Sequence, residues 1–178
     1  MTMMNNQTKN IHSDTLCTVI SGSFRKHLRE IMLLKQLLEN AHVTVLSPTG
    51  NCAVNPHEEF VVLDSDPVTH PKLLQDSVFA KIRRSTFLVV ANFDGYLGKA
   101  AILEIGYAIA TGISIYAIEP VEDPNLSPYC TPISAVFPNI NFSLVKDVKL
   151  SQAAPDKELQ DCSQLTRLKM HVNKLTEN

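Results

Sequence analysis

The chain alternates short, unbroken apolar runs with longer amphipathic stretches. Runs of this kind, with no polar residue at every second position, are typical of strands that are covered on both faces of a parallel sheet. They lie at residues 16–20, 43–46, 87–91 and 113–117. Apolar residues recur at helical spacing between them, over residues 26–40, 73–84 and 99–111. Strands that alternate with helices predict an α/β fold, a three-layer sandwich with helices on both faces of the sheet.

The remaining segments are less regular. Residues 1–14 are polar and predict a frayed tail, so a single domain is expected over 15–178. Residues 47–71 form a long loop that contains the acidic run HEEFVVLDSD; its spacing fits no standard metal-ligand set, which leaves a solvated loop or a wall of a pocket. Beyond a proline-rich connection we expect a fifth strand at 141–145 and a closing helix at 158–175.

Composition excludes several classes of function. The net charge is -2, so the chain lacks the basic face that binding to a nucleic acid polymer requires. No apolar run approaches the roughly 20 residues of a membrane span. The four cysteines are scattered without a C-x-x-C pair, which favours reduced thiols in a cytoplasmic protein. We expect neither a metal nor a cofactor.

Glu104 breaks the pattern of its own helix. It lies between Leu103 and Ile105, on the same side as Ala101 and Ala108, and follows a glycine-bearing loop. In open α/β sheets ligands bind at the carboxyl ends of the strands, next to the starts of the helices that follow them. A carboxylate at this place indicates a functional site, and the alternative is a solvated residue on the outer side of the helix.

The turn after the first strand has the composition of an anion site. It reads Ser21, Gly22, Ser23, Phe24 and Arg25. Free N–H groups at a helix start, together with the dipole and an arginine, favour a phosphate. The other interpretation is an ordinary loop whose serines cap the helix.

These motifs together resemble the nucleoside 2-deoxyribosyltransferase-like superfamily, which includes nucleoside 5'-monophosphate N-glycosidases. The resemblance is carried by Glu-Ile-Gly-Tyr-Ala at 104–108, the loop before it and the Ser-Gly-Ser turn, and covers about residues 17–117. It implies a flavodoxin-like parallel sheet in the order 2-1-3-4-5 and cleavage of the N-glycosidic bond. Glu104 then corresponds to the nucleophile, Asp76 to an aspartate that positions or protonates the base, and the turn to a phosphate site.

One position departs from the family pattern. Six residues before the nucleophile the family carries an aspartate or a serine, where this chain has Gly98. The nearest acid is Asp94, and its loop also supplies Gly95 and Tyr96 as expected substrate contacts. Members of the family often complete the pocket from a neighbouring subunit, so the resemblance also implies a homodimer or a larger homo-oligomer.

Four functions are compatible with these residues. Water that attacks a glycosyl-enzyme gives hydrolysis, and a second base gives transfer; both need Glu104 ionised, and we expect the helix dipole and nearby hydroxyls to keep its pKa low. The serine turn and Arg25 favour a phosphorylated substrate and hydrolysis. A nucleotide-binding module without catalysis is a further hypothesis, supported by Gly98. A flavin-binding or phospho-receiver domain fits less well, because the acids expected after the first strand of a receiver are missing.

Overall fold

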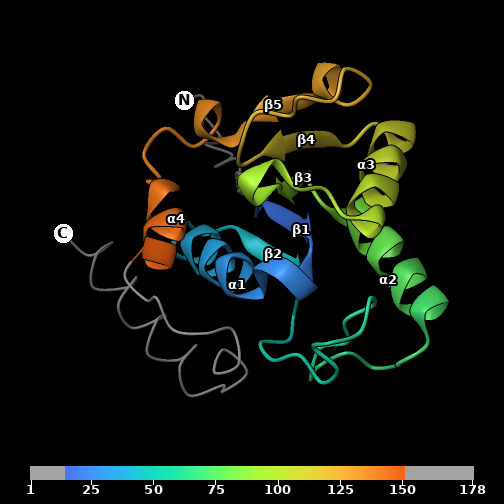
Figure 1. Cartoon of the computed structure of the whole chain (residues 1–178). Helices are drawn as coiled ribbons and strands as arrows, with labels where there is room; N and C mark the ends of the chain where they lie inside the picture. The colour runs from blue at the N-terminus through green and yellow to red at the C-terminus, as the bar shows by residue number, and fades with distance from the viewer. Residues whose placement is uncertain (1–14, 151–178) are drawn as a thin grey trace, which may run out of the picture.

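A five-stranded parallel sheet forms the centre of the molecule (Figure 1). The computed structural model describes residues 15–150. The strand order is β2-β1-β3-β4-β5, as in the flavodoxin-like fold, so the predicted fold class and order are confirmed. The strands are β1 (Cys17–Gly22), β2 (Thr44–Ser47), β3 (Phe87–Ala91), β4 (Ser114–Ala117) and β5 (Cys130–Pro132).

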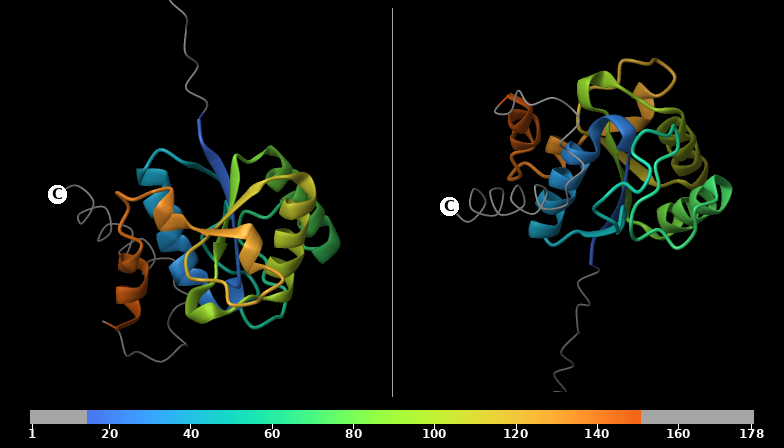
Figure 2. Two further views of the ribbon diagram at one scale, coloured as in Figure 1. Left: turned by 90° about the horizontal axis from the view of Figure 1, so that it is seen from above. Right: turned by 60° about the horizontal axis from the view of Figure 1, so that its bottom comes forward.

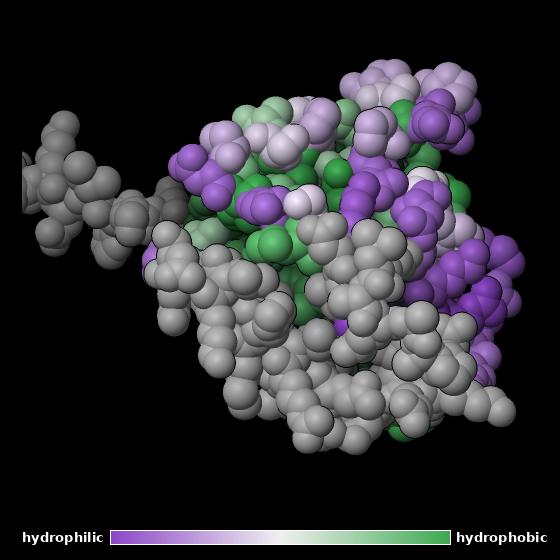
Figure 3. Space-filling view, turned by 60° about the vertical axis from the view of Figure 1, so that its left-hand side comes forward, coloured by the Kyte–Doolittle hydropathy of each residue, from purple (hydrophilic) through white to green (hydrophobic). Residues whose placement is uncertain are grey.

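Helices cover both faces of this sheet (Figure 2). They are α1 (Phe24–Asn40), α2 (Pro71–Arg84), α3 (Lys99–Thr111) and α4 (Ser143–Leu150). Helices α1 and α4 pack together on one face, and α2 and α3 on the other. Single 3-10 turns lie at η1 (Phe93–Gly95), η2 (Ser127–Tyr129) and η3 (Ile133–Ala135). On the side that carries α4, apolar residues are visible at the surface among polar ones (Figure 3).

The central strand β3 explains the unalternating apolar pattern. All five of its residues are buried. Phe87 and Val89 pack into the cluster under α1 and α4, whereas Leu88 and Val90 pack under α2 and α3. Because successive side chains of a strand point to opposite faces, a strand between two helical layers needs apolar residues at every position.

The chain differs from the sequence prediction after β4. The fifth strand is Cys130–Pro132, inside the proline-rich connection, and the strand predicted at 141–145 is wrong. There Asn141 Oδ1 accepts hydrogen bonds from the backbone N–H of Ser143 at 3.1 Å and from its hydroxyl at 2.7 Å, which starts α4. Phe142 and Val145, three residues apart, then reach the core on one side. The closing helix predicted at 158–175 and the tail at 1–14 lie outside the described residues.

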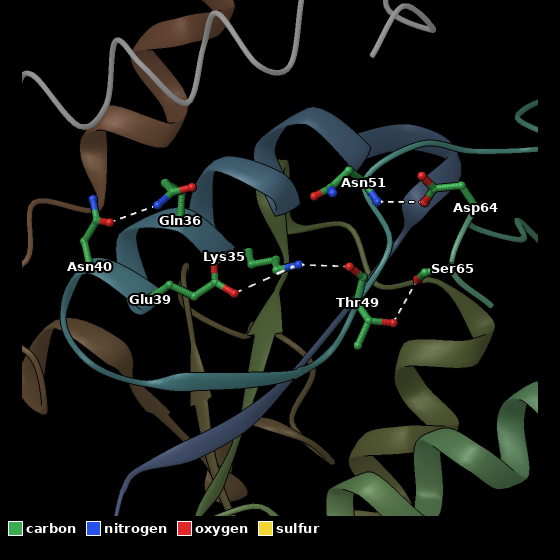
Figure 4. Close-up of polar contacts among 8 residues, drawn as sticks. All are labelled: Lys35, Gln36, Glu39, Asn40, Thr49, Asn51, Asp64 and Ser65. Carbon is green, nitrogen blue, oxygen red and sulfur yellow. Dashed lines mark hydrogen bonds and ion pairs between the residues drawn. The ribbon is translucent and has the colours of Figure 1, made fainter. Parts of the chain in front are cut away.

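The long β2–α2 loop, residues 48–70, is held by side-chain hydrogen bonds. Asn55 accepts from the backbone N–H of Val62 at 2.6 Å and donates to the carbonyl of Phe60 at 2.9 Å. Lys35 of α1 donates to the carbonyl of Thr49 at 3.2 Å, and the Thr49 hydroxyl lies 2.9 Å from that of Ser65 (Figure 4). These contacts fix the loop against α1, so it can serve as a wall.

The cysteines do not all follow the prediction of reduced thiols. Cys17 and Cys130 are free thiols. Cys52, in the β2–α2 loop, is disulfide-bonded, so the prediction is wrong at this position. Spacing along the chain could not show this, because a disulfide requires only that two cysteines meet in space. Cys162 lies outside the described residues.

Candidate functional site

A cavity of about 430 Å³ opens where β1 and β2 end. This is the size of a small-molecule site, and the carboxyl edge of the sheet is where α/β folds bind ligands. One wall comes from the end of β1 and the start of α1, and another from α2 and the start of α3. The β2–α2 loop supplies the third wall with Phe60, Val61 and Leu63. Of the two interpretations of this loop, a pocket wall is therefore the one observed.

Glu104 points into this cavity from α3. Its side chain is buried, with a residue exposure of 8%. Oε1 accepts a hydrogen bond from Nε2 of Gln75 on α2 at 3.0 Å, and Oε2 accepts one from the hydroxyl of Ser21 on β1. The carboxylate is thus held between three elements, directly beside the Ser21–Arg25 turn. The alternative of a solvated outer position is excluded.

The surroundings of Glu104 change its acidity in the direction opposite to the prediction. Burial raises the pKa of the carboxyl above its ordinary value, and the hydrogen bonds from Ser21 and Gln75 oppose this only in part. Both partners are neutral, so no positive charge compensates for the lost hydration. The expectation of a low pKa is wrong. Hydrogen bonds from a hydroxyl and an amide stabilise the carboxylate by less than the free energy that it loses when it is removed from water.

Two helix starts meet at the entrance. Ser23 is the N-cap residue of α1 and Gly98 that of α3, and neither helix start has a side-chain cap. A Cβ placed on Gly98 would lie 3.9 Å from that of Ser23. The N–H groups of both helix starts therefore remain available for an anion.

Charged side chains surround these helix starts. Nζ of Lys99 lies 2.9 Å from Oε1 of Glu59. The hydrogen bond from Lys99 and its positive charge lower the pKa of the Glu59 carboxyl, and Arg25 adds a smaller effect in the same direction. All three residues line the cavity; we call Arg25, Lys99 and Glu59 the charged mouth. A carboxylate from the β2–α2 loop already lies beside the cations, which indicates that this position accepts negative charge.

Several residues named from the sequence lie in the cavity wall. Phe24, Tyr96 and Gly98 line it, and Nζ of Lys26 lies 3.4 Å from the centre of the Tyr96 ring. Gly22 also lines it. A Cβ at Gly22 would lie 3.0 Å from the Ala91 side chain and 3.1 Å from the Ala91 carbonyl oxygen, so the close approach of β1 to β3 favours glycine there.

Three other residues named from the sequence lie elsewhere. Asp94 does not line the cavity; its side chain is 70% exposed and lies 3.7 Å from Nε2 of His27. Gly95 donates its N–H to the Glu119 carboxylate at 3.2 Å, also outside the cavity. Asp94 therefore does not fill the space beside Gly98.

Asp76 faces solvent from α2. It pairs with Lys72 at 2.5 Å and does not line the cavity. Because α2 begins at Pro71, Asp76 lies in its second turn. The neighbouring Gln75 is the residue that turns inward.

Besides Ser47, Ser77 and Lys99, sequence reasoning missed four charged or amide residues that the β2–α2 loop and α2 contribute to the cavity wall. The sequence does not indicate a role for Gln75, because a glutamine in an amphipathic helix is ordinarily expected on the exposed face. Glu59 and Asp66 were noticed only as part of an acidic loop, and Lys81 was not considered. The four residues are Glu59, Asp66, Gln75 and Lys81.

Comparisons with protein-family models, with curated proteins and with solved structures found no match to this chain. Within residues 15–150, no three metal-ligating side chains gather into a cluster. In the same part of the chain, every helix is too short or too polar to cross a membrane.

Proposed function

We propose that the protein cleaves the N-glycosidic bond of a nucleoside 5'-monophosphate and releases the free base. The observation that carries this proposal is a carboxylate, Glu104, held by two hydrogen bonds inside a cavity that has two uncapped helix starts at its entrance. The resemblance of residues 104–108 and of the Ser-Gly-Ser turn to nucleoside 2-deoxyribosyltransferase-like proteins supports the same chemistry.

The mouth supplies binding energy at the phosphate. Arg25, Lys99 and the N–H groups at the starts of α1 and α3 hold the 5'-phosphate, which displaces the carboxylate of Glu59 from Lys99. This contact fixes the sugar, so that its anomeric carbon meets the carboxylate of Glu104. Orientation of the two reacting atoms lowers the barrier without any further chemistry.

Glu104 then acts as the nucleophile. One of its carboxylate oxygens bonds to the anomeric carbon as the bond to the base nitrogen breaks and its electrons leave with the base. Ser21 and Gln75 keep the side chain in position. Water then attacks the anomeric carbon and breaks its bond to the Glu104 oxygen; the proton that this water loses goes to the departed base, and the sugar 5-phosphate leaves with the carboxylate restored.

Transfer to a second base shares the first half of this reaction. Incubation with deoxynucleoside monophosphates, with and without a free acceptor base, separates the two. Base released without an acceptor identifies a hydrolase, as we propose, and exchange that occurs only with an acceptor identifies a deoxyribosyltransferase. Substrate recovered unchanged in both arms contradicts the proposal.

A nucleotide-binding module without catalysis is the second candidate. The burial of Glu104 favours it, since the loss of hydration that raises the pKa of this carboxyl disfavours the ionised form that attacks carbon. Gly98, which offers no side chain where the resembling family has a polar one, favours it too. Binding of the monophosphate measured by calorimetry, with the ligand intact after long incubation, identifies this function.

We also propose a homodimer that buries the outer face of α3. Ile102 and Leu103 are 47% and 54% exposed, and Gly106 and Ala110 on the same side are exposed as well. A helix that is apolar on its outer face as well as its inner one is usually covered on both.

We place the protein in the cytoplasm, where nucleoside monophosphates are used. A disulfide such as that of Cys52 is unusual in this compartment, so fractionation of cells tests the location.

A further inference from the structure

Asp66 and Lys81 lie in the cavity wall without a role in the proposed cleavage. Asp66 comes from the β2–α2 loop and Lys81 from the last turn of α2. Both are half-buried. Within the described residues, neither forms a hydrogen bond or an ion pair with Glu104, whose two oxygens accept from Ser21 and Gln75.

The carboxylate of Asp66 is fixed but only partly used. Oδ2 accepts the backbone N–H of Leu63 at 2.8 Å, which sets the direction of the side chain. Among the described residues, Oδ1 has no hydrogen-bond donor. The neighbouring Ser65 ties this part of the loop to Thr49, so the open oxygen of Asp66 keeps its place.

Lys81 is a cation in the same wall without an ion pair. Across residues 15–150 no carboxylate lies within 4.0 Å of its Nζ, and that includes Asp66. The cavity therefore carries a hydrogen-bond acceptor and a hydrogen-bond donor that do not satisfy each other. A ligand that meets both groups offers an N–H donor and an oxygen acceptor.

We propose that Asp66 and Lys81 recognise the base, and that they select bases with a lactam group, in which a ring N–H adjoins a carbonyl. This inference rests on the proposed function, because it assumes that a nucleotide occupies the cavity. Hypoxanthine, guanine, uracil and thymine carry the lactam, and adenine and cytosine do not. The ring N–H donates to Oδ1 of Asp66, and Nζ of Lys81 donates to the carbonyl oxygen.

The rest of this wall suits the faces of a flat ring. Phe60, Val61 and Val78 line the cavity beside the two charged residues. Apolar side chains cover the base without distinguishing one base from another, so specificity has to come from the polar pair. Adenine would place a ring nitrogen that lacks a proton against Asp66 and an amino group against Lys81, and both contacts are repulsive.

The matched ligands for a test are deoxyinosine and deoxyadenosine 5'-monophosphates, which have the same size and differ at this group. Glu104→Gln protein keeps the ligands intact while calorimetry measures both dissociation constants. We expect the inosine nucleotide to bind about 10-fold more tightly or better, as for hydrogen bonds to charged groups. Addition of Asp66→Asn, which presents a donor in place of the acceptor, should abolish or reverse the preference.

The control is Asp64→Asn in the same Glu104→Gln protein. Asp64 belongs to the same loop and accepts the N–H of Asn51 at 2.9 Å, but it does not line the cavity. This control should keep the preference, and circular dichroism verifies that both variants fold. Equal affinities for the two nucleotides, or a preference that survives Asp66→Asn, would overturn the inference and leave the proposed function standing. If neither nucleotide binds, the proposed function fails and the inference fails with it.

Discussion

Glu104 is the residue on which the proposed chemistry depends, and burial of its carboxylate costs free energy of folding. It is the single acidic residue of α3 and is buried between neutral partners. Burial raises its pKa, so the folded protein binds a proton at this carboxyl more readily than the unfolded chain does. A residue kept at such a cost is typical of a functional site.

This cost predicts how stability depends on pH. Because the pKa of Glu104 is raised in the folded state, its contribution to stability is lost as the pH rises from the unfolded value through the folded one. Glu104→Gln removes that loss, so urea unfolding should show the variant gaining on the wild type over the range from about pH 4.5, the ordinary value, upward. A constant difference in unfolding free energy across this range would contradict the raised pKa.

Ser21 positions and stabilises the ionised form of Glu104. Ser21→Ala should raise the pKa of Glu104 further, because it removes the hydrogen bond that most strongly opposes the effect of burial. We expect kcat to fall by about 10-fold to 100-fold with little change in KM, and the acidic limb of the pH–rate profile to move to higher pH.

Thr18→Val is the matched control for Ser21→Ala. Thr18 is buried on the same strand, and its hydroxyl donates to the carbonyl of Phe87 at 2.9 Å, away from the cavity. Loss of this bond should cost about 1 kcal/mol of stability and leave the pH profile in place. A profile that moves equally in both variants would show a general structural effect.

At the scale of elements, the starts of α1 and α3 carry the two cations of the charged mouth, Arg25 and Lys99. Lys99→Gln should raise KM for a nucleoside monophosphate about 10-fold, in line with the loss of a hydrogen bond between charged groups. It should leave KM for the unphosphorylated nucleoside unchanged, since that substrate has no group to meet Lys99. Steady-state kinetics with both substrates measure the contrast.

Lys72→Gln serves as the control for the mouth. Lys72 forms an exposed ion pair with Asp76 on α2, outside the cavity, so its loss should affect neither substrate. A Lys99→Gln effect that is equal for the phosphorylated and unphosphorylated substrates would contradict a phosphate site at the mouth.

Elements with a clear pattern of apolar residues could be predicted from the sequence, and elements without such a pattern could not. Strand β3 and helix α3 were predicted at their observed bounds, because burial on both faces and helical spacing leave clear patterns. Strand β5 has three residues and offers no period, and Asn141 turned an apolar run into a helix start.

The candidate site was predictable only where local pattern determines position. Glu104 could be found because it interrupts an apolar helix. Gln75 and Asp76 are adjacent, but successive residues of a helix differ by about 100° in direction, so only one can face the cavity. The place of Asp66 in the cavity wall could not be predicted from the sequence, because the path of a long loop is set by contacts such as those of Asn55 and Ser65.

At the scale of the whole molecule, the outer face of α3 is where we expect a second copy. Leu103→Glu places a charge on that face and should shift a dimer toward monomer in sedimentation analysis. Val136→Glu is the control, since Val136 is also exposed, at 41%, but lies between η3 and α4. A monomeric wild type, or equal behaviour of both variants, would contradict an interface on α3.

The central claim is that the buried carboxylate of Glu104 breaks the bond between sugar and base. Its most direct test is chromatographic measurement of free base from deoxynucleoside monophosphates with wild-type protein and with Glu104→Gln. We predict steady release by the wild type and a loss of at least about 1,000-fold in the variant, as for removal of a nucleophile. Release by Glu104→Gln at the wild-type rate, or none by the folded wild type on any of the common nucleotides, would contradict it.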